Sequence, residues 1–302
     1  MTNEKGGWGV GALLWVLAFL LMLGAGVYQR LTGPTHPMRG AFETSGGTVS
    51  YRLVRAAWTD EQARVAVSDA PGVEGGVVVW RRYPTEDEWS EAPLVREGEE
   101  WSARLPSQPA AGKLEYFVRL EVEGDRVRLP AAEQGPAVLR YRDPVPTGVL
   151  IPHIAFMFFG VLVAWRAGLG ALFHPRGLRR LAWWAFGLIS VGGMVLGPIV
   201  QKYAFDDWWT GVPFGWDLTD NKTLVMWLAW LVAALALERM SRDGAGPPAE
   251  PGLSRRGARS VVLVASLVTV VVYLIPHSVQ GSELDYEAVE QGVPASEAIG
   301  IG

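Results

Sequence analysis

The sequence contains no cysteine, and only four of its 302 residues are histidine. The lack of cysteine excludes disulfides, zinc–thiolate sites, iron–sulfur clusters and covalently attached haem c on this chain. The net charge of −4 is small and gives no indication of a nucleic-acid partner. No nucleophile elbow, P-loop or zincin motif is present, so nothing indicates a hydrolase, and the question of enzymatic activity stays open.

Apolar sequence, in contrast, is abundant. Hydrophobic residues make up 49% of the chain, and the mean hydropathy is +0.16, yet 19% of the residues are charged. This mixture predicts membrane spans joined to a water-soluble domain. The 14 tryptophans agree with that reading, because tryptophan collects at membrane–water interfaces.

Five apolar runs predict five transmembrane helices. The first, at 8–28, is about 20 residues long, enough for a hydrocarbon core of roughly 30 Å. We interpret residues 1–35 as an uncleaved anchor; a signal peptide is the alternative, but no clear A-x-A cleavage site follows the run. The other runs form a predicted four-helix transmembrane domain, residues 147–280, at about 149–172, 181–203, 222–238 and 259–277. The last two runs are short, so their flanking residues are expected at the interface.

Residues 36–146 have a different pattern. Runs such as "TVSYRLVR", "GGVVVWRRY" and "KLEYFVRLEV" alternate apolar and polar residues between Gly, Pro and acidic clusters. This alternation predicts about seven antiparallel strands in a β-sandwich of immunoglobulin or fibronectin type. The expected fold is therefore an α-helical membrane protein with an inserted all-β immunoglobulin/fibronectin-like sandwich domain.

The charged residues between the spans predict the orientation. Arginines concentrate at 174–180 and 238–259, which places these loops in the cytoplasm. The loop at 203–222 carries four aspartates, and the tail at 281–302 is acidic. We therefore expect a multi-pass protein of the inner (cytoplasmic) membrane with a cytoplasmic N terminus. The β domain and the C-terminal tail are then periplasmic or extracellular.

Two of the four histidines share a sequence context. "LIPH" occurs at 150–153 and again at 274–277. One copy opens a predicted span and the other closes one, so the topology places His153 and His277 at the same outer level. The pair is a candidate ligand set for a metal, whether haem iron or a copper or zinc ion. The alternative is that each histidine is an interfacial polar residue.

An aromatic loop lies between these histidines in the sequence. "DWWTGVPFGWD" at 207–217 contains Trp208, Trp209 and Trp216 and ends in Asp217. Flat aromatic faces beside two imidazoles suit a planar macrocycle such as haem, whereas the alternative is an interfacial belt. The "DLTDNKT" run that begins at Asp217 is expected to cap the next helix.

This loop with its flanking histidines resembles the tryptophan-rich WWD segment of cytochrome c assembly membrane proteins, which handle haem. The resemblance extends over residues 149–280. It implies that His153 and His277 are axial ligands of a haem held at the outer surface. It also implies that four residues of the loop form the haem platform: Trp208, Trp209, Trp216 and Asp217.

Two functions follow. The first is an integral membrane protein that binds haem b through two imidazoles and works in haem handling, cytochrome assembly or electron transfer at the outer face of the membrane. Its partners would be membrane lipid and a haem or cytochrome donor or acceptor. The alternative is a non-catalytic membrane scaffold or accessory subunit that binds a protein partner through its β-sandwich. A second resemblance, to uncharacterised bacterial multi-spanning membrane proteins, implies no activity.

Overall fold

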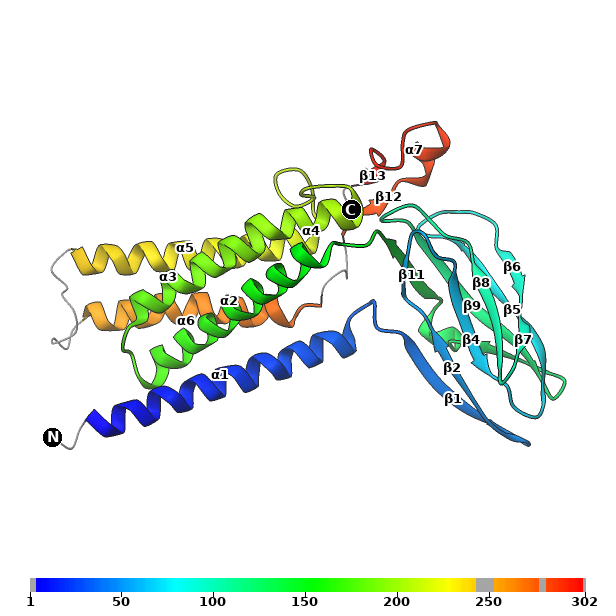
Figure 1. Cartoon of the computed structure of the whole chain (residues 1–302), viewed down its shortest axis with the longest axis horizontal. Coiled ribbons are helices and arrows are strands. Elements are labelled where there is room, and N and C mark those ends of the chain that lie inside the picture. Colours follow the sequence, from blue (N-terminus) through cyan, green and yellow to red (C-terminus); the bar gives the residue numbers. More distant parts are fainter. Residues whose placement is uncertain (1–3, 243–252, 277–280, 301–302) are drawn as a thin grey trace. The chain divides into compact units, whose positions relative to one another are not determined.

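The computed structural model describes residues 4–242, 253–276 and 281–300. The chain forms two compact units, which we call the helical unit and the β unit. The helical unit takes residues 1–32, 145–202 and 208–280, and the β unit takes residues 33–144, 203–207 and 281–302. Figure 1 shows the helices of the first and the two sheets of the second.

Among the described residues, five helical stretches are long and apolar enough to cross a membrane, as the sequence predicts. The third of these stretches, Leu178–Phe205, is one continuous helix whose middle turns are π-helical. The helical elements are α1 (Glu4–Thr32), α2 (Thr147–Phe173), α3 (Leu178–Ile189), the π-helix η2 (Ser190–Leu196), α4 (Gly197–Phe205), α5 (Leu218–Arg242) and α6 (Leu253–Leu274).

The ends of the helices differ from the apolar runs. Helix α5 begins four residues before the run at 222–238 and extends past it, because residues 218–221 and 239–242 are mostly polar but helical. Helix α6 ends at Leu274, whereas the predicted run continued to residue 277. Hydropathy records which residues tolerate lipid, and a helix continues through polar residues wherever its backbone stays hydrogen-bonded.

Small residues bring these helices close together. A Cβ atom on Gly168 of α2 would lie 2.1 Å from the Ser266 Oγ of α6, so the two backbones approach more closely than a larger residue allows. The fully buried Trp230 of α5 donates through Nε1 to the Thr269 Oγ1 of α6 at 2.8 Å. Small interfacial residues and polar bonds between helices are the usual means of packing within a bilayer.

The β unit contains two large sheets, and its C-terminal segment adds a small two-stranded one. The strand orders of the two large sheets are β1-β2-β4-β8-β7 and β3-β11-β9-β5-β6, and β10 pairs with β9. The strands are β1 (Met38–Thr44), β2 (Gly47–Leu53), β3 (Ala56–Trp58), β4 (Ala63–Ser68), β5 (Val73–Arg82), β6 (Ser90–Pro93), β7 (Val95–Glu97), β8 (Glu100–Leu105), β9 (Lys113–Val122), β10 (Asp125–Leu129) and β11 (Ala137–Arg142), with a short 3₁₀ helix η1 (Ala132–Gln134) before β11.

The expectation of about seven antiparallel strands was wrong in two respects. The structure has eleven strands between Met38 and Arg142, and β3 pairs with β11 in parallel. The additional strands β3, β6 and β7 are only three or four residues long, too short for alternation to be visible in the sequence.

One hydrophobic core lies between the two sheets. It combines Val65 and Leu105 from the first sheet with Leu114, Tyr116 and Leu139 from the second, all with no exposed surface. On β9 the residues between these, such as Glu115 and Phe117, therefore point away from the core. The alternation of "KLEYFVRLEV" thus has a physical basis: the apolar face packs in the core and the other face carries the polar residues and Phe117.

Two further segments belong to the β unit. Residues 203–207 contact it through the Asp143 N–H, which donates to the Ala204 carbonyl at 3.0 Å, and through Phe205, whose ring lies 4.3 Å from the Arg140 guanidinium carbon. The C-terminal segment also packs here and contains β12 (Glu283–Leu284), α7 (Tyr286–Glu290) and β13 (Ile299–Gly300). The acidic tail is therefore a folded part of the β unit.

Candidate functional site

His153 lies in the second turn of α2, half-buried against the π-helical segment η2. Its Nδ1 is 2.9 Å from the Gly192 carbonyl oxygen. A carbonyl oxygen only accepts hydrogen bonds, so Nδ1 carries a proton and the neutral ring keeps its lone pair on Nε2. A backbone carbonyl that fixes the tautomer in this way is a common partner of a metal-binding histidine.

Two glycines allow η2 to approach its neighbours. A Cβ atom on Gly192 would lie 3.0 Å from the Met157 Sδ of α2, and one on Gly193 would lie 2.7 Å from the Thr223 Cγ2 of α5. These glycines therefore serve close helix packing. The π-helical turn also makes the Gly192 carbonyl accept from the Gly197 N–H, five residues later, and single π-helical turns are frequent at functional sites.

The tryptophan loop presents its rings outward. Trp208 is 56% exposed and Trp216 is 72% exposed, and Phe214 beside them is 66% exposed. Trp209 is half-buried and donates through Nε1 to the Val212 carbonyl at 3.1 Å. Within the helical unit these rings are available to contact lipid or a bound molecule.

Asp217 is buried and caps α5. Its Oδ1 accepts from the Thr219 N–H at 2.7 Å and from the Asp220 N–H at 3.3 Å, which confirms the predicted cap. Asp220 in turn accepts from the N–H groups of Thr210 and Gly211, at 2.7 and 3.1 Å. The two carboxylates therefore hold the loop onto the start of α5.

Lys222 holds the end of α6, where the second "LIPH" begins. Its Nζ donates to the carbonyls of Ile275 and Pro276 at 2.8 and 3.2 Å. Gln29 of α1 donates to the Ile275 carbonyl at 3.3 Å and to the Tyr273 carbonyl. These donors satisfy carbonyls that have no partner within the helix. His277, the second predicted ligand, lies outside the described residues, so the distance from its ring to His153 is outside them too.

The sequence did not reveal a row of arginine and aromatic side chains that contact one another on the outer face of the β5–β9 sheet. The Arg81 guanidinium carbon lies 4.6 Å from the centroid of the Trp89 ring, and that ring packs edge-on against Phe117 at 5.4 Å. The Arg128 guanidinium carbon lies 4.1 Å from the centroid of the Phe117 ring, and Arg81 forms a 2.5 Å ion pair with Glu115. We call Arg81, Trp89, Phe117 and Arg128 the arginine–aromatic face.

The signal for this face was present in the alternation. Positions 115, 117 and 119 of β9 point outward, and they carry Glu, Phe and Arg. Trp89 comes from the turn before β6 and Arg128 from β10, so only strand pairing brings the set together.

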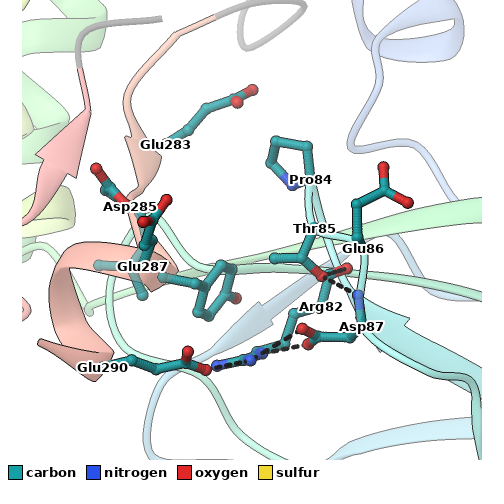
Figure 2. A pocket seen from close by; sticks show the side chains of 11 residues that line it. Arg82, Pro84, Thr85, Glu86, Asp87, Glu283, Asp285, Glu287 and Glu290 are labelled. Carbon is teal, nitrogen blue, oxygen red and sulfur yellow. Dashed lines mark hydrogen bonds and ion pairs between the residues drawn. The ribbon is translucent and has the colours of Figure 1, made fainter.

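The tail and the β5–β6 turn enclose a second feature, a cavity of about 510 Å³. Figure 2 shows Arg82 between Asp87 and Glu290, which it pairs with simultaneously. The Arg82 hydrogen bond holds the pKa of Asp87 below its ordinary value. The acidic side chains that line the cavity are Glu86, Asp87, Glu283, Asp285, Glu287 and Glu290. Among the described residues, however, no group of three His, Asp or Glu side chains is arranged to hold a metal ion.

These features define a class of protein: a bundle with five apolar helices of membrane-spanning length, joined to a two-sheet β unit into which the C-terminal tail folds. Comparison of the chain with protein-family models and with curated proteins finds no match.

Proposed function

We propose that this chain is a multi-pass subunit of the cytoplasmic membrane that binds a protein partner on the outer side through its β unit. In this proposal the β unit is of immunoglobulin or fibronectin type, the N terminus is cytoplasmic, and the tail lies outside. Arginines at 174–180 and 238–259 favour cytoplasmic loops.

The composition of the β unit supports this topology. Residues 33–144 follow one candidate span, residues 203–207 contain the end of the third, and the tail follows five. Odd numbers of crossings put all three segments on the same side of a membrane. Their packing into one unit supports the proposed five-span topology, which puts them on one side.

The arginine–aromatic face is the observation that carries the partner-binding proposal. Trp89 is 41% exposed and touches two members of the face. Arginine and aromatic residues are the side chains enriched in protein–protein interfaces and in their energetic hot spots. Arginines stacked on rings are also partly immobilised before binding, which lowers the entropy cost of association.

Crosslinking in cells that carry the full-length protein tests this function. We expect Trp89→Ala to abolish a specific crosslinked adduct that the wild type forms, because truncation removes the centre of the face. Val95→Ala is the matched control, since Val95 is a 57% exposed apolar residue on β7 of the other sheet. Equal adduct yields from wild type, Trp89→Ala and Val95→Ala would reject the arginine–aromatic face as the binding surface.

A second candidate function is haem binding by His153 and His277. The bond between His153 Nδ1 and the Gly192 carbonyl favours it, because Nε2 is then the nitrogen available to iron. Asp217 caps α5, so this proposal assigns the haem contacts to the tryptophan rings, of which Trp208 and Trp216 are the most exposed.

Absorbance of protein purified from haem-replete cells tests this candidate. Haem ligated by both imidazoles predicts a Soret band that is lost in the His153→Ala/His277→Ala variant. The His36→Ala/His174→Ala variant is the control and keeps the band, because those histidines lie in other parts of the chain. A colourless wild-type preparation would reject haem binding.

A further inference from the structure

The arginine-rich end of the helical unit contains a cavity that the proposed function does not use. It measures about 550 Å³ and is lined by Arg179, Arg180, Trp183, Trp184 and Glu238. The first four come from the first two turns of α3, and Glu238 comes from the last two turns of α5. The cavity therefore lies where the start of α3 meets the end of α5.

The spacing of the four α3 residues gives the cavity two levels. Arg179 and Trp183 are four residues apart, as are Arg180 and Trp184, so each pair occupies one stripe of the helix with the arginine one turn nearer the helix end. Trp183 is 38% exposed and Trp184 is 60% exposed. In a membrane, this order puts the guanidinium groups nearer the phosphates and the indole rings nearer the glycerol and the first acyl carbons, where tryptophan is enriched.

The positive charge of the cavity is only partly neutralised. Arg179 reaches Glu238 at 3.5 Å, a long contact, and donates to the Ser241 Oγ at 3.2 Å. Arg180 makes no ion pair within the described part of the chain. Two arginines against one glutamate leave a net charge of about +1. An occupant with a single negative charge complements it.

We infer that this cavity binds the headgroup of an anionic phospholipid with one phosphodiester, of the phosphatidylglycerol type. The arginines donate to the phosphate oxygens, a geometry for which the planar guanidinium is suited. The indole rings pack along the glycerol backbone, and their N–H groups face polar atoms at the interface. A bulk aqueous phosphate lacks the apolar part that the indoles recognise, so the lipid is the occupant.

Native mass spectrometry of the full-length protein in detergent tests the inference with dioleoyl phosphatidylglycerol and dioleoyl phosphatidylcholine as probes. We expect the wild type to retain phosphatidylglycerol preferentially. The Arg179→Gln/Arg180→Gln variant should weaken that binding about 25-fold, from about fivefold per basic residue near a membrane surface, while phosphatidylcholine binding stays unchanged.

The Arg176→Gln/Arg256→Gln variant is the matched control. It removes two charges from exposed residues at the same end of the helical unit, and neither residue lines the cavity. Equal weakening by both double variants would show a diffuse charge effect and overturn the site. Displacement of the lipid by equimolar sn-glycerol 3-phosphate would overturn the assignment to lipid. Unchanged thermal unfolding of both variants excludes misfolding as the cause of weakened binding.

Discussion

The hydroxyl of Tyr286 fastens the tail to the β unit, and its removal is the sharpest test of this docking. Tyr286 is only 6% exposed. Its Oη accepts from the Lys113 N–H at 2.9 Å and lies 2.9 Å from the Lys113 carbonyl, which also accepts from the Tyr83 N–H at 3.0 Å. A Cβ atom on Gly112 would lie 3.0 Å from this hydroxyl, so the approach depends on glycine there.

The Tyr286→Phe variant keeps the ring and removes the acceptor of the Lys113 N–H, whereas the Lys113 carbonyl retains its bond from Tyr83. Loss of a buried hydrogen-bond partner costs about 1–3 kcal/mol. Since 1.4 kcal/mol corresponds to a factor of ten, the equilibrium constant for undocking of the tail should increase about 5- to 150-fold. The cation–π contact between Arg82 and the ring, at 5.0 Å, is expected to survive.

Hydrogen–deuterium exchange with mass spectrometry measures this effect on the full-length protein in detergent. Peptides from residues 281–300 should exchange about 5- to 150-fold faster in Tyr286→Phe, with no change in peptides of the helical unit. Tyr28→Phe is the control, because Tyr28 is 51% exposed on α1. A wild-type exchange rate for the tail of Tyr286→Phe would refute the idea that this hydroxyl holds the tail.

Three further outcomes are expected. Gly168→Ala should destabilise the helical unit by about 1–3 kcal/mol in detergent unfolding, because its Cβ has no room between α2 and α6. Gly187→Ala should not destabilise the unit, because a Cβ atom there meets nothing within 4 Å. Equal destabilisation by the two variants would contradict close packing of α2 against α6 at Gly168. Lys222→Met should lower the unfolding midpoint through loss of two bonds to the end of α6; an unchanged midpoint would contradict that role. Burial raises the pKa of Tyr286 to about 12, so the docked tail favours the neutral phenol. Docking is fully present below pH 10 and weakens toward pH 12, because the undocked phenol ionises first. The chain has no native cysteine, so a single spin label on Ser296→Cys reports undocking of the tail as increased label mobility between pH 10 and pH 12. The same rise in mobility in the Tyr286→Phe variant would contradict the role of the phenol.

The coarse organisation of the chain was predictable from the sequence. Continuous apolar runs identify helices that tolerate lipid, and alternation identifies strands with one packed face. Both signals depend on local periodicity, which a sequence displays directly. Asp217 was also predictable as a helix cap, because capping involves residues only two or three positions apart.

The roles that join distant residues were not predictable. Lys222 begins the apolar run at 222–238, and its partners are carbonyls 53 and 54 residues away. The tail has an acidic composition typical of a solvated segment, yet it buries Tyr286 against Lys113, which lies 173 positions earlier. Arg81, Trp89, Phe117 and Arg128 become neighbours only through strand register.

The sequence by itself determined the class of each segment, because hydrophobic burial in lipid or in a sheet imposes a period on neighbouring residues. The tertiary structure alone decided which polar groups meet. A carbonyl can accept from many donors and a guanidinium can donate to many acceptors, so the packing of the helices and sheets decides which partner comes within about 3 Å.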